Sequence, residues 1–242
     1  MVQDRWARSE EVNIHYLDSE GKNTRETTPV FYVPGAMGCA EQFSDEMDVL
    51  SNRRCISISL RGRGKSEAPT SGYSFEHHVS DIATVVKQSG INNFCLMAHS
   101  IGVPMALKYI IDNPSKVKGL ILCDYPARYP KLTKSWVENV VSKGLLRRER
   151  EYVATEMMND SDEISLRDHL QQIRCPVLVM RGGTNQALLN ENEAQIYKEN
   201  LENVAVVTFL ESGHELWVPD YNRFMEIING FLNLLDKPNL LT

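Results

Sequence analysis

Short, continuously apolar segments alternate with helix-like segments along this chain, and this alternation limits the possible folds more than any other feature. The strand-like runs cover residues 12–17, 30–33, 55–60, 94–98, 119–123, 177–180 and 204–210. Apolar residues at helical spacing occupy most of the intervals, at 41–50, 75–88, 103–113, 191–200 and 221–235. Strands without alternating polar positions are typical of parallel sheets buried on both faces. The pattern therefore predicts an α/β fold with a mostly parallel sheet flanked by helices.

Length and composition fit one soluble domain of 1–242. The 242 residues are 42% hydrophobic and 24% charged, and the net charge of -6 argues against a nucleic-acid partner. The five cysteines are scattered and mostly lie in apolar runs, which indicates neither disulfides nor a metal site. No signal-peptide core or membrane-length apolar segment is present, so we expect a cytoplasmic location and no membrane partner. The oligomeric state stays unknown.

One stretch, 128–170, interrupts the alternation. It contains no convincing strand but two amphipathic helical patterns, at 132–141 and 152–158. An insertion between two strands of a sheet must lie outside the sheet, so we predict a short helical lid here. Trp136, Met157 and Met158 either line an apolar pocket beneath it or only attach it to the core.

A single serine stands between small residues at the junction of a strand and a helix. The sequence AHSIG at 98–102 follows the apolar run 94–98 and precedes the helical pattern 103–113. A direct strand-to-helix turn strains the backbone at Ser100 and leaves room only for small residues such as Ala98 and Gly102. The helix N-terminus also favours negative charge beside the serine. Ser100 is therefore a candidate nucleophile, with helix capping as the alternative role.

Four segments together resemble the α/β-hydrolase fold family across nearly the whole chain. They are VPGAMG at 33–38, RGRGKS at 61–66, AHSIG at 98–102 and LESGHE at 210–215. These resemble, in order, the oxyanion loop of the family, an Arg-Gly turn, the nucleophile turn and the loop of the catalytic histidine. The first departs from the usual pattern, because Pro34 replaces a histidine. We expect 61–66 to be a structural turn.

His214 is the expected base. A serine hydroxyl needs a neighbouring base, and histidine can accept and return a proton near neutral pH. We expect four other histidines to be solvated or structural. His15 lies in an edge-like strand, His77 and His78 begin an exposed helix, and His169 lies near the end of the insertion. His99 adjoins Ser100, and because neighbouring strand residues point to opposite faces, it is expected to face away.

Backbone N–H groups would stabilise the oxyanion of a tetrahedral intermediate. By the resemblance, we assign the N–H groups of Ala36 and Ile101 to this oxyanion hole. Pro34 cannot donate, so the missing histidine removes no assigned donor. We assign Met37, in the same loop, and Trp136, in the predicted lid, to substrate binding.

The third member of the triad departs from the family pattern. Most relatives carry an Asp shortly after the strand represented here by 177–180, where this chain has Asn185. An amide can orient an imidazole but supplies no charge for the imidazolium. Some relatives take the acid from the end of the preceding strand, which Asp124 follows here. We therefore predict Asp124 as the acid and keep Asn185 as the alternative; three other acidic residues near the histidine are less suitable: Glu211, Glu215 and Asp220.

The resemblance and these residues predict a serine hydrolase that cleaves a small carboxylic ester through an acyl-enzyme, without metal or organic cofactor. A lactonase or an acyltransferase would use the same triad. Relatives that act on epoxides or haloalkanes are disfavoured, because they place Asp at the nucleophile position. A rival hypothesis is a catalytically slow, ligand-binding protein, which Asn185 keeps open.

Overall fold

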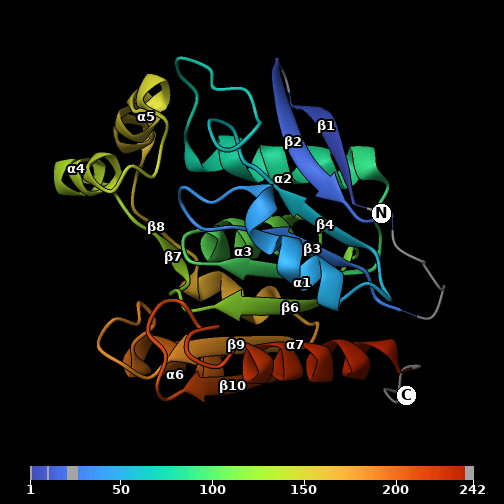
Figure 1. Ribbon diagram of the computed structural model, residues 1–242. Coiled ribbons are helices and arrows are strands. Elements are labelled where there is room, and N and C mark those ends of the chain that lie inside the picture. Colours follow the sequence, from blue (N-terminus) through green and yellow to red (C-terminus); the bar gives the residue numbers. More distant parts are fainter. Residues whose placement is uncertain (1, 10, 21–26, 238–242) are drawn as a thin grey trace.

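An eight-stranded sheet forms the centre of the computed structural model, which describes residues 2–9, 11–20 and 27–237 (Figure 1). Its strands are β1 (Gln3–Ser9), β2 (Val12–Asp18), β3 (Val30–Val33), β4 (Cys55–Ile58), β5 (Phe94–His99), β6 (Val117–Cys123), β9 (Val177–Gly182) and β10 (Val204–Phe209). They lie in the order β1-β2-β4-β3-β5-β6-β9-β10. The first two pairings are antiparallel and the remaining five are parallel. The predicted, mostly parallel sheet is confirmed, and β1 is an edge strand that the sequence did not reveal.

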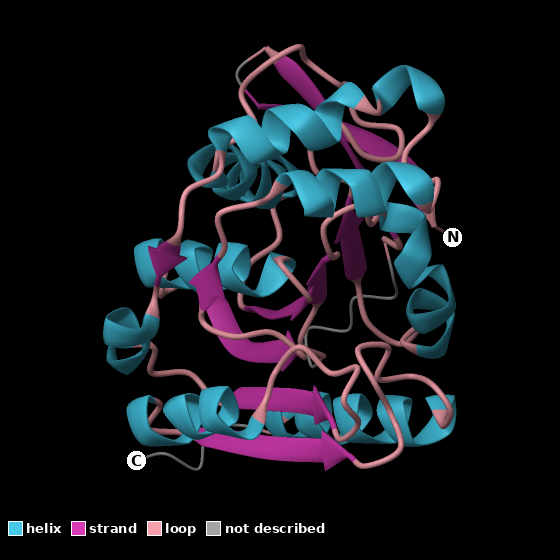
Figure 2. Ribbon diagram, turned by 90° about the vertical axis from the view of Figure 1, so that its left-hand side faces the viewer, coloured by secondary structure: helices cyan, strands magenta, loops and turns pink. Residues whose placement is uncertain are grey.

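Helices cover both faces of this sheet (Figure 2). They are η1 (Ala40–Phe43), α1 (Ser44–Val49), α2 (Phe75–Ser89), α3 (Gly102–Asp112), α6 (Glu191–Asn200) and α7 (Tyr221–Asp236). Alternate residues of β3 enter different cores: Phe31 and Val33 pack with α2, α3 and α6, whereas Val30 and Tyr32 pack with η1, α1 and α7. Burial on both faces explains why the strands are apolar at successive positions.

The insertion at 128–170 leaves the sheet after β6 and contains α4 (Lys134–Ser142), η2 (Arg148–Arg150) and α5 (Tyr152–Asp160). The prediction that it contains no strand was wrong. Two-residue strands β7 (Arg128–Tyr129) and β8 (Ile164–Ser165) pair antiparallel at its base, followed by η3 (Arg167–Gln172). Strands this short give no periodic signal in a sequence. We call residues 128–170 the helical insertion.

A turn after β4 supports both the helical insertion and the loop after β3. The Arg61 guanidinium donates to the Asp81 carboxylate of α2 at 2.7 Å, and both side chains are buried. Arg63 donates from Nε to the Ala36 carbonyl at 2.8 Å and from Nη2 to the Met157 sulfur of α5 at 2.9 Å. The turn at 61–66 therefore has the structural role that we predicted from the sequence.

No helix among the described residues combines the length and the apolar character that crossing a membrane requires.

Candidate active site

Ser100 occupies a strained turn between β5 and α3. Its φ of 56° lies in the left-handed region, which non-glycine residues adopt mainly where the surroundings enforce it. Its backbone N–H donates to the Cys123 carbonyl at 3.0 Å. A Cβ on Gly102 would lie 2.5 Å from the Pro34 carbonyl oxygen, so only glycine fits at this close approach. The glycine two positions after the serine thus lets the loop after β3 pack directly against the turn.

The buried Asp124 forms a hydrogen-bonded pair with the partly exposed His214. His214 Nδ1 donates to Asp124 Oδ2 at 2.8 Å, and the aspartate is fully buried immediately after β6. Burial raises the pKa of this carboxyl, but hydrogen bonds from His214 and from the backbone N–H groups of Leu188 and Gly182 outweigh it, so the net pKa is lowered. Asp124 is therefore a carboxylate at neutral pH, held against one nitrogen of the imidazole.

Asn185 lies elsewhere on the loop after β9. Its side chain is exposed and borders a second, separate hollow, which the loop of His214 also lines. Within the described residues no hydrogen bond joins Asn185 to His214. The structure thus brings Asp124, and not Asn185, to the Nδ1 side of the imidazole.

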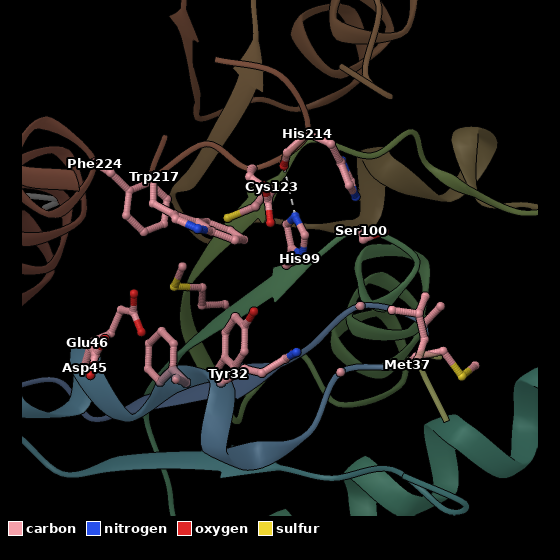
Figure 3. A pocket seen from close by; sticks show the side chains of 18 of the residues that line it. Tyr32, Met37, Asp45, Glu46, His99, Ser100, Cys123, His214, Trp217 and Phe224 are labelled. Atoms are coloured by element: carbon pink, nitrogen blue, oxygen red, sulfur yellow. Dashed lines mark hydrogen bonds between the residues drawn. The ribbon is translucent and has the colours of Figure 1, made fainter. Parts of the chain in front are cut away.

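Ser100 and His214 border one cavity of about 580 Å³. Figure 3 shows the His214 ring above Ser100, both at the same end of this cavity. No hydrogen bond joins Ser100 Oγ to His214 among the described contacts, and catalytic hydrogen bonds are often long before substrate binds.

The two residues assigned to the oxyanion hole come from the loop after β3 and from the Ser100 turn itself. Ala36 belongs to the loop after β3, and this loop touches the serine: a Cβ on Gly35 would lie 3.0 Å from Ser100 Cβ. Ile101 precedes the first residue of α3. Arg63 Nε donates to the Ala36 carbonyl and so holds the peptide group that follows Ala36 in this loop.

The expectation that His99 faces away was wrong. His99 lines the same cavity, donates from Nε2 to the His214 carbonyl at 3.1 Å, and its ring centroid lies 4.5 Å from that of His214. Burial, with a smaller contribution from neighbouring His214, lowers the pKa of His99 to about 4, so its ring is neutral. Strand alternation fails here because Ser100 already belongs to the turn, and the cavity lies on the face that His99 shares with Met97.

Two further histidines are structural, as one of the two expected roles, but their surroundings differ from the prediction. His78 is buried rather than exposed at the start of α2, and its Nε2 accepts a hydrogen bond from Arg63 Nη1 at 2.8 Å. His15 lies in β2, which pairs on both sides, so it does not belong to an edge strand. Neither ring borders the cavity at Ser100.

Met37 and Trp136, both predicted to bind substrate, line the cavity, whereas Met157 and Met158 do not. Sequence reasoning missed other lining residues, which come from η1, α1, the loop after His214 and α7: Phe43, Asp45, Glu46, Trp217, Tyr221 and Phe224. Trp217 could have been predicted to line the cavity, because it lies only three residues after His214 in the sequence. Glu46 gave no signal, because it resembles any acidic residue of an amphipathic helix.

One group of described side chains has the composition of a metal site, namely Asp4, His15 and Glu41. It does not border the cavity, and the Lys65 ammonium lies 2.5 Å from Asp4 Oδ1 and 3.3 Å from Glu41 Oε1. A lysine thus supplies the positive charge that a metal ion would bring to this group.

Comparison with known proteins points to one fold. A family model for the alpha/beta hydrolase fold matches residues 28–152. The AB hydrolase superfamily protein YisY of Bacillus subtilis is 23% identical over 250 residues, covering 85% of this chain and 91% of that protein. A (lyso)-N-acylphosphatidylethanolamine lipase of Bos taurus is 34% identical over 131 residues, covering 49% of this chain and only 38% of the lipase. Among solved structures, an esterase from Exiguobacterium antarcticum has a TM-score of 0.81 at 22% identity, over 96% of this chain and 100% of that one.

Proposed function

Because this chain belongs to the α/β-hydrolase fold family, we propose that it is a serine hydrolase that cleaves a small carboxylic ester through an acyl-enzyme. The main support is the buried Asp124 carboxylate that holds His214 Nδ1 at 2.8 Å, beside a serine with a φ of 56° on the same cavity. This combination provides a base with a fixed tautomer and a serine that borders the cavity, which is what serine catalysis requires.

In the first step the Ser100 hydroxyl attacks the carbonyl carbon of the ester. The proton of the hydroxyl passes to His214 Nε2, because Nδ1 already carries a proton that it donates to Asp124. The oxyanion that forms receives hydrogen bonds from the N–H groups of Ala36 and Ile101. The alcohol then leaves with the proton from His214, and Ser100 keeps the acyl group.

In the second step water replaces the alcohol. His214 Nε2 takes a proton from water, the hydroxide adds to the acyl carbon, and Ser100 leaves with the proton returned by His214. A lactone would be opened by the same two steps, and another alcohol in place of water would give acyl transfer.

The helical insertion acts in this proposal as a lid that shapes the substrate cavity of a single domain. Trp136, Asn139 and Val140 of α4 border the cavity from the insertion, together with residues of the sheet. Contacts of η2 and α5 with the turn at 61–66, made by Arg150 and Met157, attach the insertion beside the site.

Hydrolysis of p-nitrophenyl acetate by purified wild-type protein and Ser100→Ala tests the proposal. We expect the substitution to lower kcat/KM at least about a thousandfold while the fold is retained, since the nucleophile is lost. Ser142→Ala, at an exposed serine at the end of α4, serves as the control and should be fully active. Equal rates for wild type and Ser100→Ala would refute the proposal.

A further inference from the structure

The end of the cavity away from Ser100 contains acidic and aromatic side chains with no part in the chemistry described above. Asp45 and Glu46 come from α1, and Tyr221 and Phe224 from α7. In Figure 3 the two acidic residues lie across the cavity from Ser100, with Trp217 and Phe224 above them. The chain therefore builds this end from elements that are separate from those of the triad.

Glu46 has one buried carboxyl oxygen without a hydrogen-bond partner among the described residues. The residue is only 9% exposed, and the oxygen without a partner is Oε2. Burial, together with the charge of Asp45, raises the pKa of Glu46, although Tyr221 close by acts in the opposite direction. The Tyr221 hydroxyl is likewise buried without a partner. Leaving such groups unsatisfied is costly, which indicates that a ligand completes them.

The charged residues that border the cavity are of one sign. Asp45, Glu46 and Glu215 are acidic, and no lysine or arginine is among the described residues that line the cavity. His99 adds no positive charge, because burial keeps it neutral. A cation entering this cavity is therefore attracted, and an anion is repelled.

Aromatic rings surround the same end. Tyr32 and Phe43 stack with centroids 4.2 Å apart, and Trp217 meets Phe224 edge-on at 5.9 Å. All four residues line the cavity. Aromatic faces beside a carboxylate are a combination that stabilises organic ammonium ions, because the ring quadrupole attracts the cation.

We propose that this end of the cavity binds an ammonium group of the substrate, with Glu46 Oε2 accepting its N–H. The assignment deepens and rests on the proposed function, since it restricts the ester to one with a protonated amine on the portion that reaches away from Ser100. A primary or secondary amine fits better than a quaternary one, because Glu46 and Tyr221 both have capacity for hydrogen bonds.

Calorimetric titration of three ligands of equal chain length tests the subsite without catalysis. The ligands are n-hexylammonium, 1-hexanol and hexanoate, titrated into wild type, Glu46→Gln and the control Asp48→Asn. Asp48 is an exposed acidic residue of the same helix and does not border the cavity. We expect wild type and Asp48→Asn to bind hexylammonium about tenfold or more tightly than hexanol, with hexanoate weakest, and Glu46→Gln to lose most of that preference.

Equal affinity of wild type for hexylammonium and hexanol, or no binding of hexylammonium, would overturn the proposal, even if Glu46→Gln failed to fold. An unchanged preference in folded Glu46→Gln, or an equal loss in Asp48→Asn, would do the same. Hydrolysis of p-nitrophenyl acetate measured alongside separates the two proposals. Ammonium preference without hydrolysis removes the proposed ester cleavage and keeps the subsite, whereas hydrolysis without the preference removes only the subsite.

Discussion

Replacing Asp124 by asparagine perturbs the proposed catalytic unit at its most buried point. The Asp124 oxygens each accept two hydrogen bonds: Oδ2 from His214 Nδ1 and the Leu188 N–H, and Oδ1 from the N–H groups of Gly182 and Leu189. An amide has only one acceptor oxygen, so its NH₂ group must face two N–H donors in either orientation. The substitution therefore conflicts with the surroundings whichever way the side chain turns.

The effect on activity follows from the imidazole. An NH₂ group facing His214 would make Nδ1 an acceptor and leave the proton on Nε2, where it prevents His214 from accepting the serine proton. The equivalent change in serine proteases lowers kcat about 10⁴-fold, which corresponds to about 5.5 kcal/mol. We expect Asp124→Asn to lower kcat for p-nitrophenyl acetate by about 10³ to 10⁴-fold.

The same substitution should lower stability in a pH-dependent way. Loss of an acceptor for a buried N–H costs about 1–3 kcal/mol in the free energy of unfolding. The net pKa of Asp124 is lowered in the folded state, because the bonds from His214 and the backbone outweigh the opposing effect of burial. The carboxylate therefore stabilises the fold at neutral pH, and this contribution is lost as the pH falls through the lowered pKa. The difference between wild type and variant in urea unfolding should accordingly shrink in acid.

Asn185→Asp is the matched control, because Asn185 is exposed and makes no hydrogen bond to His214 among the described residues. We expect it to leave kcat unchanged. A fully active Asp124→Asn enzyme, or a clear gain in rate from Asn185→Asp, would refute the assignment of Asp124.

Two further predictions concern the support of the site and its selectivity. Asp81→Asn leaves the buried Arg61 guanidinium without its carboxylate and should lower the free energy of unfolding, measured in urea, by about 3–5 kcal/mol. Asp112→Asn, in an exposed pair with Lys108, is the control and should lower it by less than about 1 kcal/mol. Equal losses in the two variants would contradict the structural role of the turn. Trp136→Ala removes a side chain of the helical insertion from the cavity wall and so enlarges the cavity. It should change the ranking of kcat/KM among p-nitrophenyl esters of different acyl length more than it changes the rate on the acetate. A uniform loss over all esters would assign Trp136 to packing.

The predictable parts of this fold are those with strong periodicity. The parallel strands were recognised because burial on both faces makes them continuously apolar, and the interval predicted as a helix at 191–200 has the bounds of α6. The edge strand β1 was not predicted because most of its residues are polar and only Ala7 and Ser9 are buried. A strand with so few buried positions is defined by its pairing with β2 rather than by its own sequence.

The site was predictable where one local motif determines the geometry. The turn around Ser100 has a sequence signature because only small residues fit beside it, and Gly102 shows that limit directly. The direction of His99 and the burial of Glu46 depend on which loops cover the ends of the strands, and no local pattern encodes that. Asp124 was inferred from its resemblance to relatives that take the acid from the end of the same strand, whereas its partners at Leu188 and Gly182 required the structure.

Labelling with a fluorophosphonate tests most directly whether Ser100 is an activated nucleophile. Such a reagent forms a stable bond only with a serine whose proton is removed by a neighbouring base and whose developing charge is stabilised. The account predicts stoichiometric labelling of wild type, located by peptide mass spectrometry at Ser100, slower labelling of Asp124→Asn and none of Ser100→Ala. Absence of labelling in folded wild-type protein, or labelling that persists in Ser100→Ala, would contradict it.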